Sequence, residues 1–233
     1  MKTHPILFNT EMVQAILQGR KTQTRRVIKA DIPEKATFIG CTESKEKGVG
    51  FYFSDGTTGI MQGFYPSLLD DLYCPYGQVG DVLWVRESFY SIESENHWSI
   101  SQMVMCKSKI FYAADIKNYE TKRPLHRGKN RPSIHMPKTF ARIFLQITDV
   151  RIERLNDISD KDSISEGIKT DNCEGKDCYY FYPSNDLRDD SYLDSPKTSF
   201  YSLWNSINGE KAWALNPWVW VVEFERIEKP INF

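Results

Sequence analysis

The sequence has no long apolar run, little cysteine and no excess of either charge. No segment approaches the eighteen or so apolar residues that a membrane helix requires, and the N-terminus turns polar after Phe8, too early for the apolar region of a secretory signal. The 30 Lys and Arg against 31 Asp and Glu exclude a histone-like polycation and an acidic disordered tail. These absences predict a soluble, globular, cytoplasmic protein with no membrane partner.

The five cysteines are an odd number, scattered along a chain of 233 residues that is long enough to need no crosslinks. Free thiols in a reducing compartment are therefore expected. Cys173 and Cys178 could instead hold zinc together with Cys74 or a histidine, or form a redox pair, but no second close pair supports a structural zinc site. The P-loop, GxGxxG, GxSxG and HExxH signatures are also missing. We expect neither a metal nor a cofactor.

The charges are balanced in total but segregated along the chain. Two stretches, 12–30 and 121–148, contain Lys and Arg and no acid, whereas residues 149–194 carry thirteen acids against six Lys or Arg. Two basic stretches brought together would form a surface for phosphate or nucleic acid. The alternative is a set of solvated faces without a partner.

Alternating and helical patterns predict several strands and two or three helices. Thr10 is a candidate N-cap, apolar residues follow at helical spacing, and Gly19 supplies a left-handed stop. A second helix is expected between a cap at Ser159 and a stop at Gly167. Strands are expected at 5–8, 20–27, 82–87, 140–153 and 218–225, a short helix at 200–207, a hairpin around 51–56, and irregular structure at 170–196. Without a βαβ rhythm, this pattern favours an α+β protein in which a small barrel carries helices.

One cluster suggests chemistry. Lys21 and Thr24 lie just past the helix stop among Arg20, Arg25 and Arg26. Neighbouring cations disfavour a protonated lysine, so the pKa of Lys21 is expected to fall toward neutrality, and a neutral lysine can act as a general base for a hydroxyl or a water. A phosphate-binding patch is the simpler interpretation of the same residues.

The order of four blocks resembles the ASCH domain family, and longer ASCH proteins common in phages and prophages in particular. The blocks are GRKTQTRR at 19–26, GDVLWV at 80–85, ITDV at 147–150 running to EGI at 166–168, and WVVEF at 220–224; RPSIHMP at 131–137 and NPWVW at 216–220 extend the match. The resemblance implies a PUA-like small β-barrel with flanking helices. It covers both termini, so residues 1–233 are expected to form a single domain with insertions at about 30–73, 90–130 and 170–198.

A compact bacterial branch of that family consists of N4-acetylcytidine amidohydrolases with a Lys–Thr–Glu triad. By resemblance these roles fall on Lys21, Thr24 and Glu166, and the implied reaction is hydrolysis of the acyl amide of a nucleoside or nucleobase. Arg26 would orient the substrate or stabilise the oxyanion. Further substrate contacts are expected at Tyr76, Trp84 and His135. Barrel packing is the alternative for the two aromatic residues, and a position in a loop without a role in the pocket is the alternative for His135.

The second hypothesis is a non-catalytic module that binds RNA or another nucleic acid. Its contacts would be the arginines of the two basic stretches, Arg20, Arg25, Arg123, Arg127 and Arg131. A third is a phage-encoded interaction protein whose acidic stretch contacts a host factor.

Overall fold

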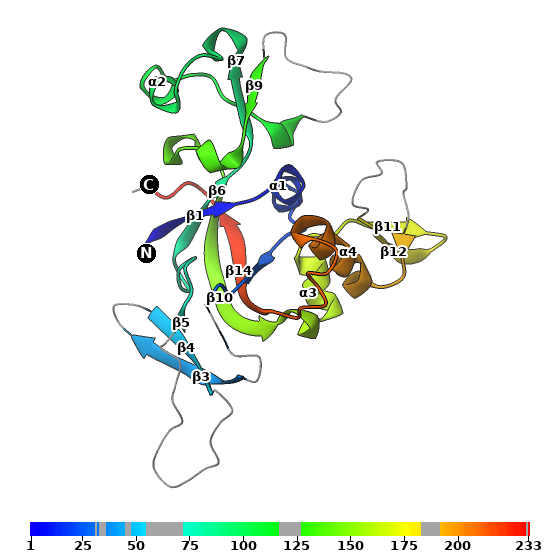
Figure 1. Ribbon diagram of the computed structural model, residues 1–233. Coiled ribbons are helices and arrows are strands. Elements are labelled where there is room, and N and C mark those ends of the chain that lie inside the picture. Colours follow the sequence, from blue (N-terminus) through cyan, green and yellow to red (C-terminus); the bar gives the residue numbers. More distant parts are fainter. Residues whose placement is uncertain are drawn as a thin grey trace.

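A five-stranded sheet forms the centre of the protein in the computed structural model, which describes residues 1–30, 32, 36–44, 48–54, 72–116, 127–182, 192–231 and 233. The strand order is β1-β6-β10-β14-β2 (Figure 1). The bounds are β1 Thr3–Leu7, β6 Val82–Arg86, β10 Phe144–Arg154, β14 Trp218–Ile227 and β2 Gln23–Val27. β1 runs parallel to β6 and the other neighbours are antiparallel.

The α+β class is confirmed, but the described strands do not close into a barrel. β1 and β2 stand at opposite ends of the strand order, and within the described residues no pairing joins them. The expected closed barrel is therefore replaced, in this part of the chain, by an open and strongly curved sheet (Figure 1).

Three small sheets lie in the three ranges where insertions were expected. The first joins β3 (Thr37–Ser44), β4 (Gly48–Ser54) and β5 (Leu72–Tyr73). Residues 51–53 of the expected hairpin lie in β4, which pairs with β3, whereas Asp55–Gly56 lies outside the described residues. The second joins β7 (Phe89–Ile92), β8 (Phe111–Tyr112) and β9 (Arg127–Arg131). The third joins β11 (Thr170–Cys173), β12 (Lys176–Tyr180) and β13 (Tyr192–Leu193).

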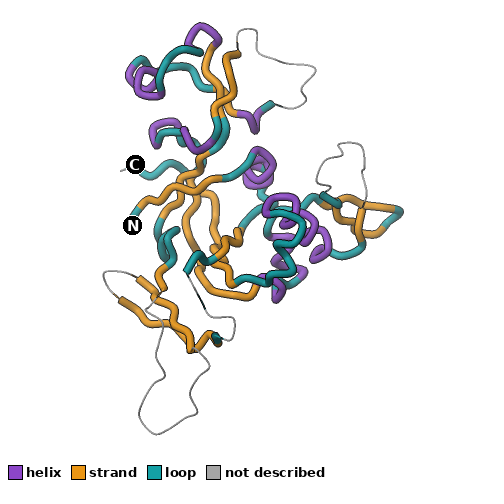
Figure 2. The backbone as a smooth tube through the Cα atoms, viewed as in Figure 1, coloured by secondary structure: helices purple, strands orange, loops and turns teal. Residues whose placement is uncertain are grey.

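The helices that matter for the site gather beside the β2 edge of the central sheet (Figure 2). They are α1 (Thr10–Leu17), α3 (Asp160–Ser165) and α4 (Pro196–Asn208), and α2 (Ile100–Met105) lies with the second small sheet. Short 3-10 turns are η1 Glu93–Glu95, η2 Ala113–Asp115, η3 Ser133–His135, η4 Lys138–Phe140 and η5 Leu155–Asp157. No described helix is both long and apolar enough to cross a membrane.

The caps differ in one place from the expectation. Ser159 caps α3 as predicted, its side chain accepting from the backbone N–H of Asp162. For α1 the cap is Asn9, whose side-chain oxygen accepts from the N–H of Met12 at 2.8 Å, so Thr10 is the first helical residue rather than the cap. Asn is as good a cap as Thr. Because β1 ends at Leu7, the chain reaches Asn9 before Thr10 as it turns into the helix.

Strand alternation along β14 sorts the core into two layers. Val219 and Val221 pack on the α4 side with residues such as Leu203, while Trp220 and Val222 pack in the main cluster. β2 pairs with β14 so that residues directly opposite share a face. Consequently Arg25, opposite Val221, faces the layer with α3 and α4, and Thr24 and Arg26 face the main cluster.

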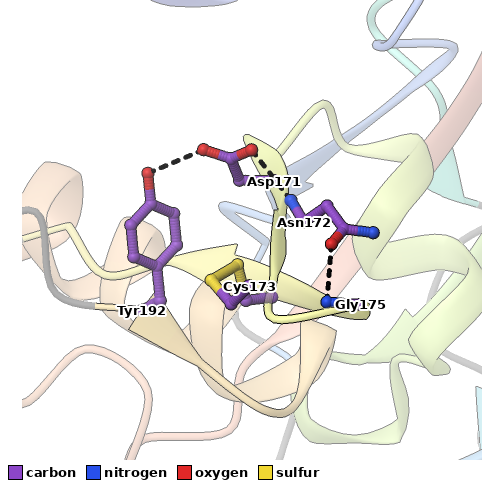
Figure 3. The surroundings of a disulfide bond; sticks show 6 residues. Asp171, Asn172, Cys173, Gly175 and Tyr192 are labelled. Carbon is purple, nitrogen blue, oxygen red and sulfur yellow. Dashed lines mark hydrogen bonds between the residues drawn. A yellow bond between two sulfur atoms is a disulfide. The ribbon is translucent and has the colours of Figure 1, made fainter.

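The cysteine expectation was wrong for one pair. Cys173 and Cys178 form a disulfide that links β11 to β12, with a Cα–Cα distance of 5.8 Å (Figure 3). The sequence segment had been expected to be irregular, but Glu174 and Gly175 take positive φ angles of 53° and 85° and close a tight hairpin that brings the two thiols together. The remaining cysteines, Cys41, Cys74 and Cys106, are free thiols.

Candidate functional site

The end of α1 and the end of α3 meet at Lys21 and Glu166. Gly19 adopts a φ of +74° and ends α1, after which the N–H groups of Arg20 and Lys21 both donate to the carbonyl of Ala15. Lys21 then forms an isolated β-bridge with Glu166. Gly167 allows this approach, since it has a φ of +90° and an added Cβ would lie 2.7 Å from the Cβ of Lys21.

The ammonium group of Lys21 is enclosed by Glu166. Its Nζ lies 2.8 Å from Glu166 Oε2 and 2.8 Å from the Glu166 backbone oxygen, and the residue is only 3% exposed. Burial lowers the pKa of Lys21, the charge and hydrogen bond of Glu166 oppose this, and the charges of Arg26 and Arg25 add to the lowering. The lowered pKa was expected from crowding by cations, but the larger cause is loss of solvent.

Lys21 and Arg26 meet at one aromatic ring. The Lys21 Nζ lies 5.7 Å and the Arg26 Cζ 5.2 Å from the centroid of the Phe8 ring. Lys21 lies in the turn before β2, which begins at Gln23. Its ammonium group binds Glu166 at the end of α3, as the Arg25 guanidinium also does, and the Gln23 amide donates to the Asp162 carbonyl of that helix. These shared partners agree with the alternation of the block, which groups Lys21 with Gln23 and Arg25.

Arg26 is fixed from β1 and lies near Tyr76. Its guanidinium donates to the Leu7 carbonyl at 2.7 Å, and its pKa is lowered by burial against the opposing influence of Tyr76 and Glu166. Burial raises the pKa of the Tyr76 phenol, while the Arg26 charge lowers it. Of the expected substrate contacts, Tyr76 is thus the one that the structure couples electrostatically to Arg26.

A pocket opens at the edge strand β2 beside α4, and residues from both faces of β2 line it. Its polar lining consists of Thr24, Arg25, Arg26, Glu166 and Asn208, and its apolar lining consists of Met12, Val27, Phe200, Leu203, Trp204 and Ile207. The α4 residues follow the spacing i, i+3, i+4, i+7, i+8 along one face of the helix. That spacing predicts a helix from the sequence, but it carries no signal of where the helix packs, so the wall formed by α4 was not anticipated.

Arg25 is buried beneath three carboxylates. Its side chain has no exposed surface; the NH2 group lies 2.8 Å from Glu153 Oε2 and 3.3 Å from Asp162 Oδ2, and the NH1 group lies 3.3 Å from Glu166 Oε1. This placement disagrees with its expected role as a contact for nucleic acid, because a polyanion cannot reach a guanidinium already enclosed by acids.

Other expected site residues lie apart from the pocket lining. Trp84 is buried on β6 in a cluster with Phe144 and Phe233, so it packs in the core, which was the alternative to a substrate contact. His135 is exposed at the end of η3. Arg20 donates to the carbonyls of Gly167 and Ile168, at 2.5 Å and 3.2 Å, and so braces the turn after α3.

The second basic stretch is described only in part. Arg131 is 9% exposed and donates to the carbonyls of Trp98 and Glu95, so it holds the loop before α2 instead of facing solvent. Arg123 and the side chain of Arg127 lie outside the described residues, and their expected contacts stay predictions. No group of three or more His, Cys, Asp or Glu among the described residues is arranged to hold a metal.

Comparison of the chain with protein-family models, curated proteins and solved structures found no match.

Proposed function

We propose that the protein is an amidohydrolase that acts on an N-acylated nucleoside or nucleobase resembling N4-acetylcytidine, with Lys21, Thr24 and Glu166 as its catalytic residues. The observation that carries the proposal is the desolvated Lys21–Glu166 pair, 2.8 Å between Nζ and Oε2, at a pocket lined by Thr24. Lys21, with its lowered pKa, and the buried Thr24, three residues further along the chain, supply the base and the nucleophile that acyl transfer requires.

In the proposed reaction, neutral Lys21 takes the hydroxyl proton of Thr24 while the Thr24 oxygen attacks the acyl carbon. The carbon–nitrogen bond of the tetrahedral intermediate then breaks, and the departing amine receives a proton. Water attacks the resulting acyl ester, again with Lys21 as base, and releases the carboxylic acid and free Thr24. The proton that the amine receives is the one that Lys21 took from Thr24. Glu166 either holds Lys21 in place while Lys21 delivers this proton, or passes it from Lys21 to the amine, so that Lys21 is neutral again when water attacks.

The remaining pocket residues suit such a substrate. Arg26 is a cation at the Thr24 face of β2, where it would stabilise the oxyanion of the intermediate or bind a carbonyl of the base. The apolar face of α4, with Trp204 and Leu203, provides a surface for the acyl group or a flat base. Tyr76 does not line this pocket, and its proposed contact with the substrate rests on its charge interaction with Arg26.

Two neighbouring threonines provide a matched test. Thr24 is 2% exposed and lines the pocket, whereas Thr22 is exposed and belongs to the same block. We expect Thr24→Ala to lower kcat for an N4-acylcytidine by at least about 10³-fold, the scale of losing a nucleophile, and Thr22→Ala to leave kcat near the wild-type value. Both are measured by release of free cytidine, with circular dichroism as the folding control. Equal activity of the two variants would contradict the proposal.

A further inference from the structure

Glu166 is shared between two cations. Its Oε2 accepts from Lys21 Nζ at 2.8 Å, and its Oε1 accepts from Arg25 NH1 at 3.3 Å. An ionised carboxylate only accepts hydrogen bonds, and a proton placed on either oxygen would disrupt one of these two contacts. The carboxylate plane is therefore fixed from both sides, with one oxygen directed at each cation.

Arg25 is itself anchored at its other end. The NH2 group binds Glu153 on β10 and Asp162 on α3, so the guanidinium cannot turn away from Glu166 without leaving two further carboxylates. A planar guanidinium can bridge several carboxylates in this way, which the single ammonium group of a lysine cannot match.

We propose that Arg25 is a positioning residue for the proposed hydrolysis: by holding Oε1 of Glu166 it keeps Oε2 on Lys21, so that Glu166 orients Lys21 and does not serve as the acid. This inference rests on the proposed function. Lys21 then makes both proton transfers. It takes the Thr24 proton when the carbon–oxygen bond forms, and it returns that proton to nitrogen when the carbon–nitrogen bond breaks and the electron pair moves to the amine.

The charges around Lys21 agree with this assignment. Arg25 repels the Lys21 ammonium and so contributes to lowering the pKa of Lys21, after the larger effects of burial and of Arg26. Loss of Arg25 removes that repulsion and also leaves Glu166 with Lys21 as its remaining cationic partner among the described contacts. Both changes favour the protonated form of Lys21.

Arg151 provides a matched control. It binds the same two anchoring carboxylates, with Nε 2.5 Å from Glu153 Oε1 and NH2 3.5 Å from Asp162 Oδ2. Its contacts among the described residues do not include Glu166. Arg151→Gln therefore removes one guanidinium from the network without touching the carboxylate that faces Lys21.

The first test needs no turnover. The Lys21 side chain is titrated by NMR in protein labelled with ¹³C-lysine, with Lys21→Ala to assign the signal. We expect the Lys21 midpoint to rise in Arg25→Gln, to rise less in Arg25→Lys, which keeps the charge, and to stay at the wild-type value in Arg151→Gln. An unchanged midpoint in a folded Arg25→Gln protein would overturn the proposal. If Arg25→Gln does not fold, the crystal structure of Arg25→Lys decides: the Lys21 Nζ–Glu166 Oε2 distance should lengthen from 2.8 Å, and an unchanged distance overturns it.

The second test separates positioning from binding. On an N4-acylcytidine, Arg25→Lys should lower kcat on the order of 100-fold, the cost of a misplaced catalytic group, with little change in KM, and Arg151→Gln should lower neither. Wild-type kcat in Arg25→Lys would overturn the inference. Absence of turnover in the wild-type protein, combined with the expected NMR shift, would instead reject the proposed function while leaving the positioning of Lys21 by Arg25 in place.

Discussion

Lys21 determines how the proposed reaction depends on pH. Because burial lowers the pKa of Lys21 below its ordinary value of 10.5, the neutral, basic form appears at a lower pH than for an exposed lysine. We expect kcat to rise with pH through that lowered pKa and then to level off. The measurement is a pH–rate profile under saturating substrate; a rate that rises only above pH 10.5, or that falls over the same range, would contradict Lys21 as the base.

The same shift affects stability. At pH values between the lowered pKa of folded Lys21 and 10.5, Lys21 holds more protons in the unfolded chain than in the folded protein. The contribution of Lys21 to the free energy of unfolding therefore increases with pH over this range. Below both values Lys21 is charged in both states and the contribution is constant. The proposed base is thus a residue whose burial destabilises the fold near neutral pH.

For single residues, the sequence indicated which side chains belong to the candidate site better than it indicated what surrounds them. The basic block after Gly19 pointed to Lys21 and Thr24, but not to the burial that lowers the pKa of Lys21. The charge pattern of the two basic stretches also suggested that Arg25 and Arg131 are surface cations. In the structure, Arg25 lies under carboxylates from β10 and α3. Such partners are more than a hundred residues away in the chain, and no local pattern reveals them.

Among the elements, the β11–β12 hairpin has the clearest testable feature. Its disulfide closes a very short loop, for which chain-entropy estimates give about 2 kcal/mol of stabilisation. We expect the Cys173→Ala/Cys178→Ala variant to lose about that much free energy of unfolding in urea. Because neither cysteine lines the pocket, kcat should stay at the wild-type value.

A thiol reductant supplies the control for the hairpin. Reduction should destabilise the wild-type protein by a similar amount and should leave the double alanine variant unchanged. Equal unfolding midpoints for oxidised wild type, reduced wild type and the variant would show that the crosslink contributes nothing to stability.

Long periodic elements were predictable and the tight hairpin was not. The apolar alternation of β10 and β14 and the spacing of α4 are visible in the sequence. The hairpin depends on a positive φ at Glu174, a conformation that a glutamate rarely adopts, so the polar stretch around it suggested irregular structure.

Over the whole molecule, segments of opposite charge are brought together. The acid-free stretch 12–30 meets the acidic stretch 149–194, and Lys21 and Arg25 pair with Glu166, Glu153 and Asp162. The balanced net charge of −1 therefore includes charges that neutralise one another at the pocket. Segregation along the sequence suggested a surface for polyanions, but in the described structure the first basic block helps to build an enclosed site.

The most direct test of this account is the release of free amine from a panel of N-acylated nucleosides by the 233-residue chain. Wild-type protein and Lys21→Ala are compared, with the exposed Lys29→Ala as control, and products are identified by mass spectrometry. The account predicts that wild type and Lys29→Ala convert at least one N4-acylcytidine to cytidine and that Lys21→Ala does not. Product from the folded wild-type protein no greater than from Lys21→Ala, across the whole panel, would contradict it.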